Sequence, residues 1–104
     1  MTERLIVTEF LDPDGSMVVS AQRTADRVLP ILQRGQPVTL SFNGMRGVSS
    51  SFFNVLLRQL APVTGIGDLM NRVSFEFDSS VQEMVFRRSL ERLQSNGVES
   101  NSAE

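Results

Sequence analysis

The sequence contains no cysteine, histidine, lysine, tryptophan or tyrosine. Without cysteine and histidine, disulfides, the usual zinc sites and the usual proton shuttle at neutral pH are missing. Without lysine there is no amine for Schiff-base chemistry or for a phosphate-binding loop. Only carboxylates, hydroxyls and guanidinium groups remain for catalysis, so we expect a protein that is not an enzyme and needs no cofactor or metal.

Long apolar runs and concentrated charge are also missing. No apolar stretch approaches the ~18 residues that cross a bilayer, and no signal-like segment opens the chain. The ten arginines are scattered and the formal net charge is −2, whereas nucleic-acid binders normally gather their basic residues in a patch. We therefore expect a soluble cytoplasmic protein that binds neither membrane nor nucleic acid.

The hydrophobic content of 40% suits a globular core, and 104 residues fit one domain. Residues 95–104 are polar and small, so we expect a single domain over 1–94 and a disordered tail over 95–104.

Hydrophobic periodicity and turn residues divide the chain into strands and helices. The β-branched segments 5–10 and 17–19 flank an Asp-Pro-Asp-Gly turn and predict an antiparallel hairpin. Ser20 is the expected N-cap of the first helix, and Ser80 with Glu83 forms the expected capping box of the last. The predicted helices cover 20–34, 50–60 and 80–93, the remaining strands cover 37–42 and 73–77, and 63–72 is a predicted loop.

The resulting order, β-β-α-β-α-β-α, predicts an α/β fold with a mixed four-stranded sheet flanked by helices. Strands 38–42 and 73–77 should pair in parallel, with the hairpin as an antiparallel edge. Phe52, Leu56, Phe75 and Phe77 are expected to include core residues.

The most distinctive local pattern is a serine-rich turn before the second helix. Ser49, Ser50 and Ser51 are suited either to capping that helix or to presenting a site for a phosphate or a partner's anion. We identify Gly47, Ser49, Ser50, Ser51, Phe52 and Asn54 as candidates for partner binding or a phosphoserine switch.

The stretch from Val38 to Leu57, with Ser41-Phe42, Gly47-Val48 and Ser50-Ser51-Phe52, resembles the centre of STAS domains, including the anti-anti-sigma factors. It looks still closer to bacterial STAS-like domains of unknown function, and the likeness extends over about residues 5–90. By position, the phosphorylatable serine of the anti-anti-sigma factors falls on Ser51. The chain departs from the family pattern, since Ser41 and Ser49 stand where the family has Asp, and Phe52 stands where it has Gly.

The resemblance implies a non-catalytic regulatory protein-interaction module. Its partner would be a histidine-kinase-like ATPase or a sigma-regulatory protein. The alternative is a structural or assembly subunit that forms homo-oligomers.

The last helix carries apolar residues on two sides. Val81, Met84 and Val85 form one stripe and three others lie roughly opposite, so one stripe is left for a loop, the tail or another chain. The candidate oligomer contacts are Phe86, Leu90 and Leu93. A third hypothesis, an unrecognised hydrolase or transferase, would need a carboxylate such as Glu76 or Asp78 in a cleft.

Overall fold

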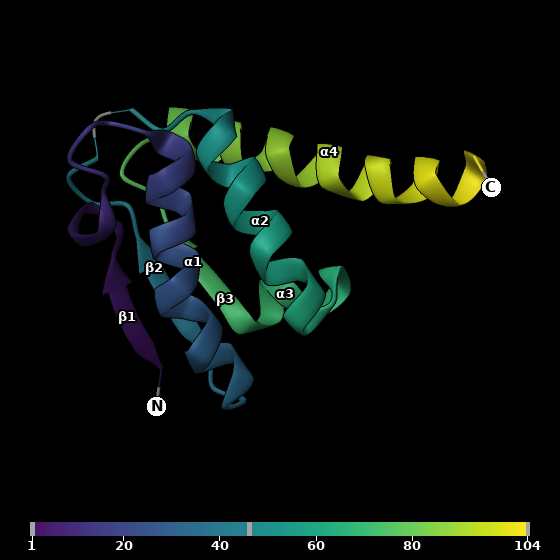
Figure 1. The fold of residues 1–104 in the computed structure, drawn as a ribbon, viewed down its shortest axis with the longest axis horizontal. Helices are drawn as coiled ribbons and strands as arrows, with labels where there is room; N and C mark the ends of the chain where they lie inside the picture. Colours follow the sequence, from purple (N-terminus) through teal and green to yellow (C-terminus); the bar gives the residue numbers. More distant parts are fainter. Residues whose placement is uncertain (1, 46, 104) are drawn as a thin grey trace.

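Figure 1 shows the computed structural model, which describes the backbone of residues 2–45 and 47–103 and, except at 66 and 96–103, their side chains. Within these residues the chain forms three β-strands, one 3₁₀ helix and four α-helices. They are β1 (Glu3–Ile6), η1 (Val7–Phe10), α1 (Met17–Gln33), β2 (Val38–Ser41), α2 (Ser50–Thr64), α3 (Ile66–Arg72), β3 (Val73–Glu76) and α4 (Ser80–Ala103). The predicted α/β class is confirmed.

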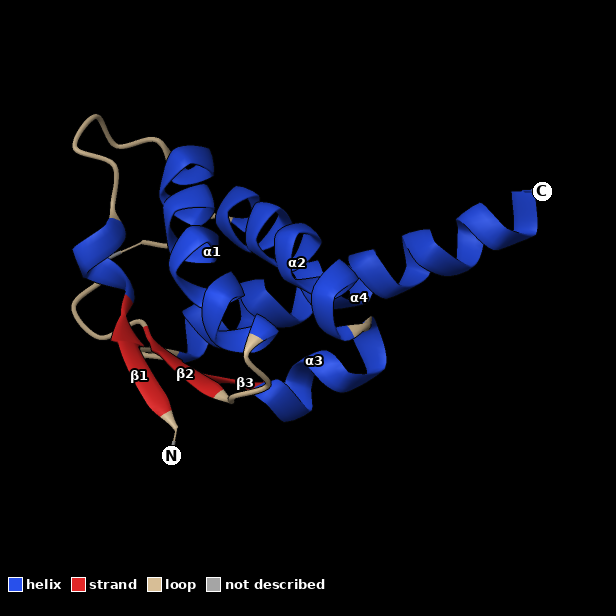
Figure 2. Cartoon of the chain, turned by 60° about the horizontal axis from the view of Figure 1, so that its bottom comes forward, coloured by secondary structure: helices blue, strands red, loops and turns tan. Residues whose placement is uncertain are grey.

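The strands form a parallel sheet in the order β1-β2-β3. Leu5, Leu40 and Phe75 are aligned across it, so the parallel pairing predicted between 38–42 and 73–77 is confirmed. Figure 2 shows the helices gathered over one face of the sheet. Because successive side chains of a strand alternate between faces, the opposite face carries Arg4 and Glu76, which form an ion pair of 2.9 Å.

The predicted hairpin is wrong, and the described residues form three strands rather than four. Residues 17–19 begin α1 because Ser16, not Ser20, caps that helix: the Ser16 hydroxyl accepts a hydrogen bond of 3.2 Å from the Val19 amide. Ser20 is buried instead, and its hydroxyl accepts a hydrogen bond of 2.8 Å from the Asp12 amide. The turn therefore leads into a helix and not into a returning strand.

The predicted loop over 63–72 is also wrong. α2 continues through Pro62 to Thr64, and α3 follows directly. Gly65 makes this junction with a φ of 80°, a left-handed conformation that glycine adopts without steric cost. Leu69 is fully buried, so burial of its side chain favours the short helix over an irregular loop.

α4 begins at Ser80 and is capped one residue earlier than expected. The Ser79 hydroxyl accepts a hydrogen bond of 3.2 Å from the Gln82 amide. The helical backbone continues to Ala103, past the expected end at 93, and its last turns extend away from the rest of the molecule (Figure 1). No proline follows Leu93 to stop the helix. The division into a domain over 1–94 and a disordered tail stays a prediction.

The core lies between the sheet and the helices, and aromatic rings form much of it. Phe42, which follows β2, lies 5.4 Å from the ring of Phe53 and 5.8 Å from that of Phe52. Phe52 and Leu56 are fully buried, as predicted, whereas Phe75 and Phe77 are half-buried and pack against the same core. This packing anchors the start of α2 against the end of β2.

Candidate functional site

The segment between β2 and α2 is attached to the body of the molecule at its upstream end. The Gly44 amide donates a hydrogen bond of 3.3 Å to Asp78 Oδ2, and Gln82 Nε2 donates one of 3.0 Å to the Met45 carbonyl. Gly44 has a φ of 87°, which a residue with a Cβ rarely adopts, and the Met45 side chain is buried. The start of α4 therefore fixes the loop that leaves β2.

The downstream end of the segment is held by the first turn of α2. Phe52 and Phe53 are both fully buried, with their rings 5.6 Å apart. The Ser89 hydroxyl of α4 lies 3.5 Å from the Ser50 carbonyl, at the limit of a hydrogen bond. The turn is thus anchored on both sides by core residues and by α4.

Between these anchors, Gly47, Ser49, Ser50 and Ser51 are exposed. Ser49 occupies the N-cap position of α2, but its side chain makes no capping hydrogen bond. A Cβ on Gly47 would meet nothing within 4 Å. The turn, defined as residues 47–51, therefore presents three serines that the fold does not bury.

Two other candidates lie away from this surface. Phe52 was proposed for partner binding, but it is 0% exposed and belongs to the core, so that assignment is corrected. Phe52 is the third residue of α2 and belongs to the apolar face of this helix that packs in the core. Asn54 is half-buried and lines a small crevice with Ser89 and Arg92 of α4, so it faces the neighbouring helix.

Of the expected oligomer contacts on α4, the structure corrects Phe86, whereas Leu90 and Leu93 stay a prediction. Phe86 is 3% exposed and its ring lies 4.4 Å from that of Phe75, so it is a core residue and not a surface for another chain. Leu90 and Leu93 are partly buried against the same core. In the other stripe, Val81 is 64% exposed and Met84 is 51% exposed, whereas Val85 is partly buried against the core.

The two carboxylates considered for catalysis are both engaged by the fold. Glu76 Oε1 accepts hydrogen bonds of 3.1 and 2.9 Å from Nε and Nη2 of Arg4. Asp78 Oδ2 accepts a hydrogen bond from the Gly44 amide. Among the side chains that the structure describes, no three carboxylates are grouped as metal ligands would be. The expectation that the protein is not an enzyme stays a prediction.

Sequence reasoning missed the residues that hold the turn. Gln82 is 4% exposed and bonds both the Met45 carbonyl and, through Oε1, the Asp78 amide at 2.7 Å. The available signal was its position three residues after Ser79, where the polar residue of a capping box lies. Gln82 and Met45 are 37 positions apart in the sequence, so the contact between them leaves no local sequence pattern.

Residues 20–78 match the family described as a STAS-like domain of unknown function (DUF4325). The match covers more than half of the chain and runs from α1 to the residue before the α4 cap. The chain belongs to this family. Comparisons with curated proteins and with solved structures found no match.

Within this STAS-like domain, the structure shows the surroundings of two serines that the resemblance singles out, Ser41 and Ser51. Ser41, at the end of the central strand, is 1% exposed, and its hydroxyl accepts hydrogen bonds of 3.3 Å from both Arg4 Nη2 and the Asn43 amide. Ser51 lies exposed in the first turn of α2. In the described part of the chain, no helix is both long and apolar enough to span a bilayer.

Proposed function

We propose that this STAS-like domain is a non-catalytic regulatory module that docks a protein partner on residues 47–51 and the adjoining exposed residues of α2. One observation supports this above the others: exposed Ser49, Ser50 and Ser51 lie between two anchored segments. A surface fixed before binding loses less conformational entropy when the partner arrives, which favours recognition.

The chemistry of the turn suits regulation by charge. The first turn of a helix carries unpaired amides and a partial positive charge, so it favours an anion. Phosphorylation of an exposed serine adds about −1.5 to −2 charges at neutral pH. Ser51, which corresponds by resemblance to the phosphorylated serine of the anti-anti-sigma factors, is the proposed switch residue.

The partner follows from the resemblance. STAS domains of the anti-anti-sigma type act with histidine-kinase-like ATPases, and a partner of that class, or a sigma-regulatory protein, is proposed for this chain. Neither a membrane nor a nucleic acid is part of the proposed function.

The direct test mixes the purified protein with histidine-kinase-like ATPases encoded in the same operon. We expect a complex between the two proteins, and mass spectrometry of the native protein should find phosphate on Ser49, Ser50 or Ser51. Absence of both the complex and the phosphate would reject the proposal.

A further inference from the structure

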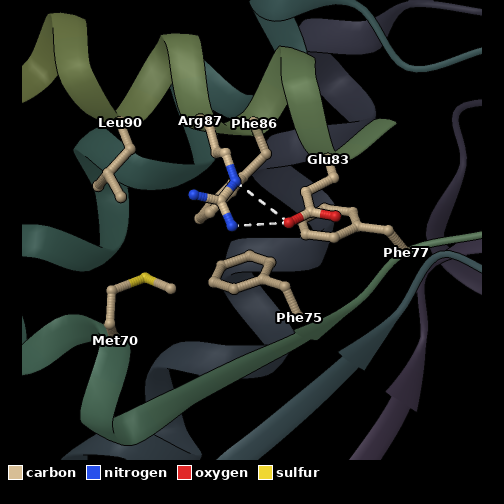
Figure 3. Close-up of a pocket in the computed structure, with 7 residues that line it drawn as sticks. All are labelled: Met70, Phe75, Phe77, Glu83, Phe86, Arg87 and Leu90. Atoms are coloured by element: carbon tan, nitrogen blue, oxygen red, sulfur yellow. Dashed lines mark hydrogen bonds and ion pairs between the residues drawn. The ribbon is translucent and has the colours of Figure 1, made fainter. Parts of the chain in front are cut away.

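A pocket of about 460 Å³ lies between β3, α3 and α4, and the serine turn does not line it (Figure 3). Its volume falls within the ~300–1,000 Å³ that is typical of small-molecule sites. Phe75, Phe77 and Phe86 form its aromatic lining, and Met70 and Leu90 lie toward one end. This aromatic pocket therefore has the size and the apolar lining of a site for a small molecule.

The lining suits an aromatic ligand. Figure 3 shows Arg87 and Leu90 on the α4 side of the pocket, with Met70 and Phe75 facing them. The Phe75 ring is half-buried and Met70 is 44% exposed, so both side chains keep apolar surface within reach of a ligand. Aromatic rings and thioether sulfurs both make favourable contacts with a further aromatic ring. A ring placed against Phe75 and Met70 would gain both kinds of contact.

The rim of the pocket offers a group that can bind an anion. Among the described side chains that line the pocket, the charged ones are Glu83 and Arg87. Arg87 Nε and Nη2 donate hydrogen bonds of 3.1 and 2.8 Å to the same oxygen, Glu83 Oε2. The remaining nitrogen, Nη1, lies on the side of the guanidinium away from Glu83, toward Leu90 (Figure 3). The arginine side chain is 71% exposed, so its Nη1 end is accessible.

We infer that the aromatic pocket binds a small aromatic carboxylate. The ring of the ligand lies against Phe75 and Met70, and its carboxylate accepts hydrogen bonds from Nη1 and Nη2 of Arg87. A guanidinium has five N–H donors, so Arg87 serves Glu83 with one edge and the ligand with the next. This site goes beyond the proposed function, because ligand binding here requires no partner protein.

The ion pair at the rim gives the inference a sign that can be tested. Glu83 and the ligand are both anions and share one guanidinium, so Glu83 weakens the ligand's hold on Arg87. Removing the carboxylate of Glu83 should therefore tighten binding, whereas removing the guanidinium of Arg87 should weaken it. An ion pair that only stabilised α4 would give the two changes the same effect.

An NMR titration of the methyl groups with cinnamate tests the site. We expect saturable shifts at the Met70 and Leu90 methyls, caused by the ring of the probe, and none at Val63, which lies outside the pocket. The dissociation constant should be about 1–5 mM, as ligands of this size give. Cinnamamide has the same ring without the charge and should bind at least about ten-fold more weakly.

Three variants test the rim with the same probe. Arg87→Gln should weaken cinnamate binding about ten-fold or more, and Glu83→Gln should strengthen it. Both variants break the same ion pair inside α4, so the opposite signs arise from the ligand. Arg88→Gln makes the same change at the next position of α4, outside the pocket, and should leave the affinity within about two-fold.

A second pair of variants tests the apolar side of the pocket. Met70→Glu places a like charge beside the ligand and should abolish the shift at Leu90. Val63→Glu makes a comparable change at a residue that is 41% exposed and lies outside the pocket, so it should bind cinnamate as the parent does.

The inference is overturned if cinnamate leaves the Met70 and Leu90 methyls unshifted at several times the expected dissociation constant. Equal affinity for octanoate would show that the ring is not recognised, and tighter binding of cinnamylamine would show that Glu83 holds the ligand instead. A change in the same direction for Arg87→Gln and Glu83→Gln also overturns it.

Discussion

The rings of six phenylalanines pack against one another in the core: Phe42, Phe52, Phe53, Phe75, Phe77 and Phe86. They come from segments far apart in the sequence, so each ring helps to fix one element against another. Phe52 illustrates the limit of prediction at this scale. Its place after three serines suggested a surface role, whereas its helical spacing to Leu56 suggested the core, and only tertiary packing decides between them.

Phe86→Ala should destabilise the protein by about 3–5 kcal/mol, because it removes a buried ring with aromatic neighbours. Val81→Ala, on the exposed side of the same helix, should change the free energy of unfolding by no more than about 0.5 kcal/mol. Urea denaturation measures both. A loss below about 1 kcal/mol for Phe86→Ala would contradict the assignment of this residue to the core.

The two serine caps should differ in strength. Ser16 accepts a hydrogen bond from the Val19 amide, so Ser16→Ala should cost about 0.5–2 kcal/mol. Ser49 makes no such bond, so Ser49→Ala should cost less than about 0.5 kcal/mol. Thermal unfolding of the two variants, compared with the parent, measures the difference. Equal losses would mean that Ser49 caps α2 in solution and that its hydroxyl is not free for recognition.

At the scale of elements, strongly patterned segments were predicted and short ones were not. The strand at 38–42 and the strict alternation of 73–77 predicted the β2–β3 pair in the correct parallel sense. Residues 17–19 failed because a short β-branched run is compatible with either a strand or a helix, and the Ser16 cap favours the helix. Segment 63–72 failed because Pro62, Gly65 and Gly67 suggested a loop, whereas burial of Leu69 stabilises a helix.

Removal of residues 95–104 tests the proposed boundary of the domain. Among the side chains that the structure describes, Leu93 is the last of α4 to pack against the core, and the ribbon beyond it extends away from the body (Figure 1). Truncation after Gln94 should therefore change the free energy of unfolding by no more than about 0.5 kcal/mol. Circular dichroism during thermal unfolding gives the comparison. A loss of several kcal/mol would show that the tail contributes to the folded domain.

Over the whole molecule, the fold separates two surfaces: the serine turn before α2 and the aromatic pocket beside β3. The sequence predicted the first because serines before an apolar helix form a local pattern. It could not predict the second, whose lining residues come from α3, β3 and α4 and meet only in the folded chain. The sequence could not predict that Gln82 anchors the turn, for the same reason.

The most direct test of the proposed function is the affinity of the partner ATPase for Ser51→Asp, measured beside Ser80→Asp. Both substitutions add one charge to an exposed serine in the first turn of a helix, where negative charge is favoured by about 0.3–1 kcal/mol, so both proteins should fold. Only Ser51 lies in the proposed docking turn. Desolvating an unpaired charge costs several kcal/mol, so Ser51→Asp should change the dissociation constant at least about ten-fold while Ser80→Asp leaves it unchanged. If the two variants bind the ATPase as the parent does, the serine turn is only the start of a helix and the proposed function is wrong.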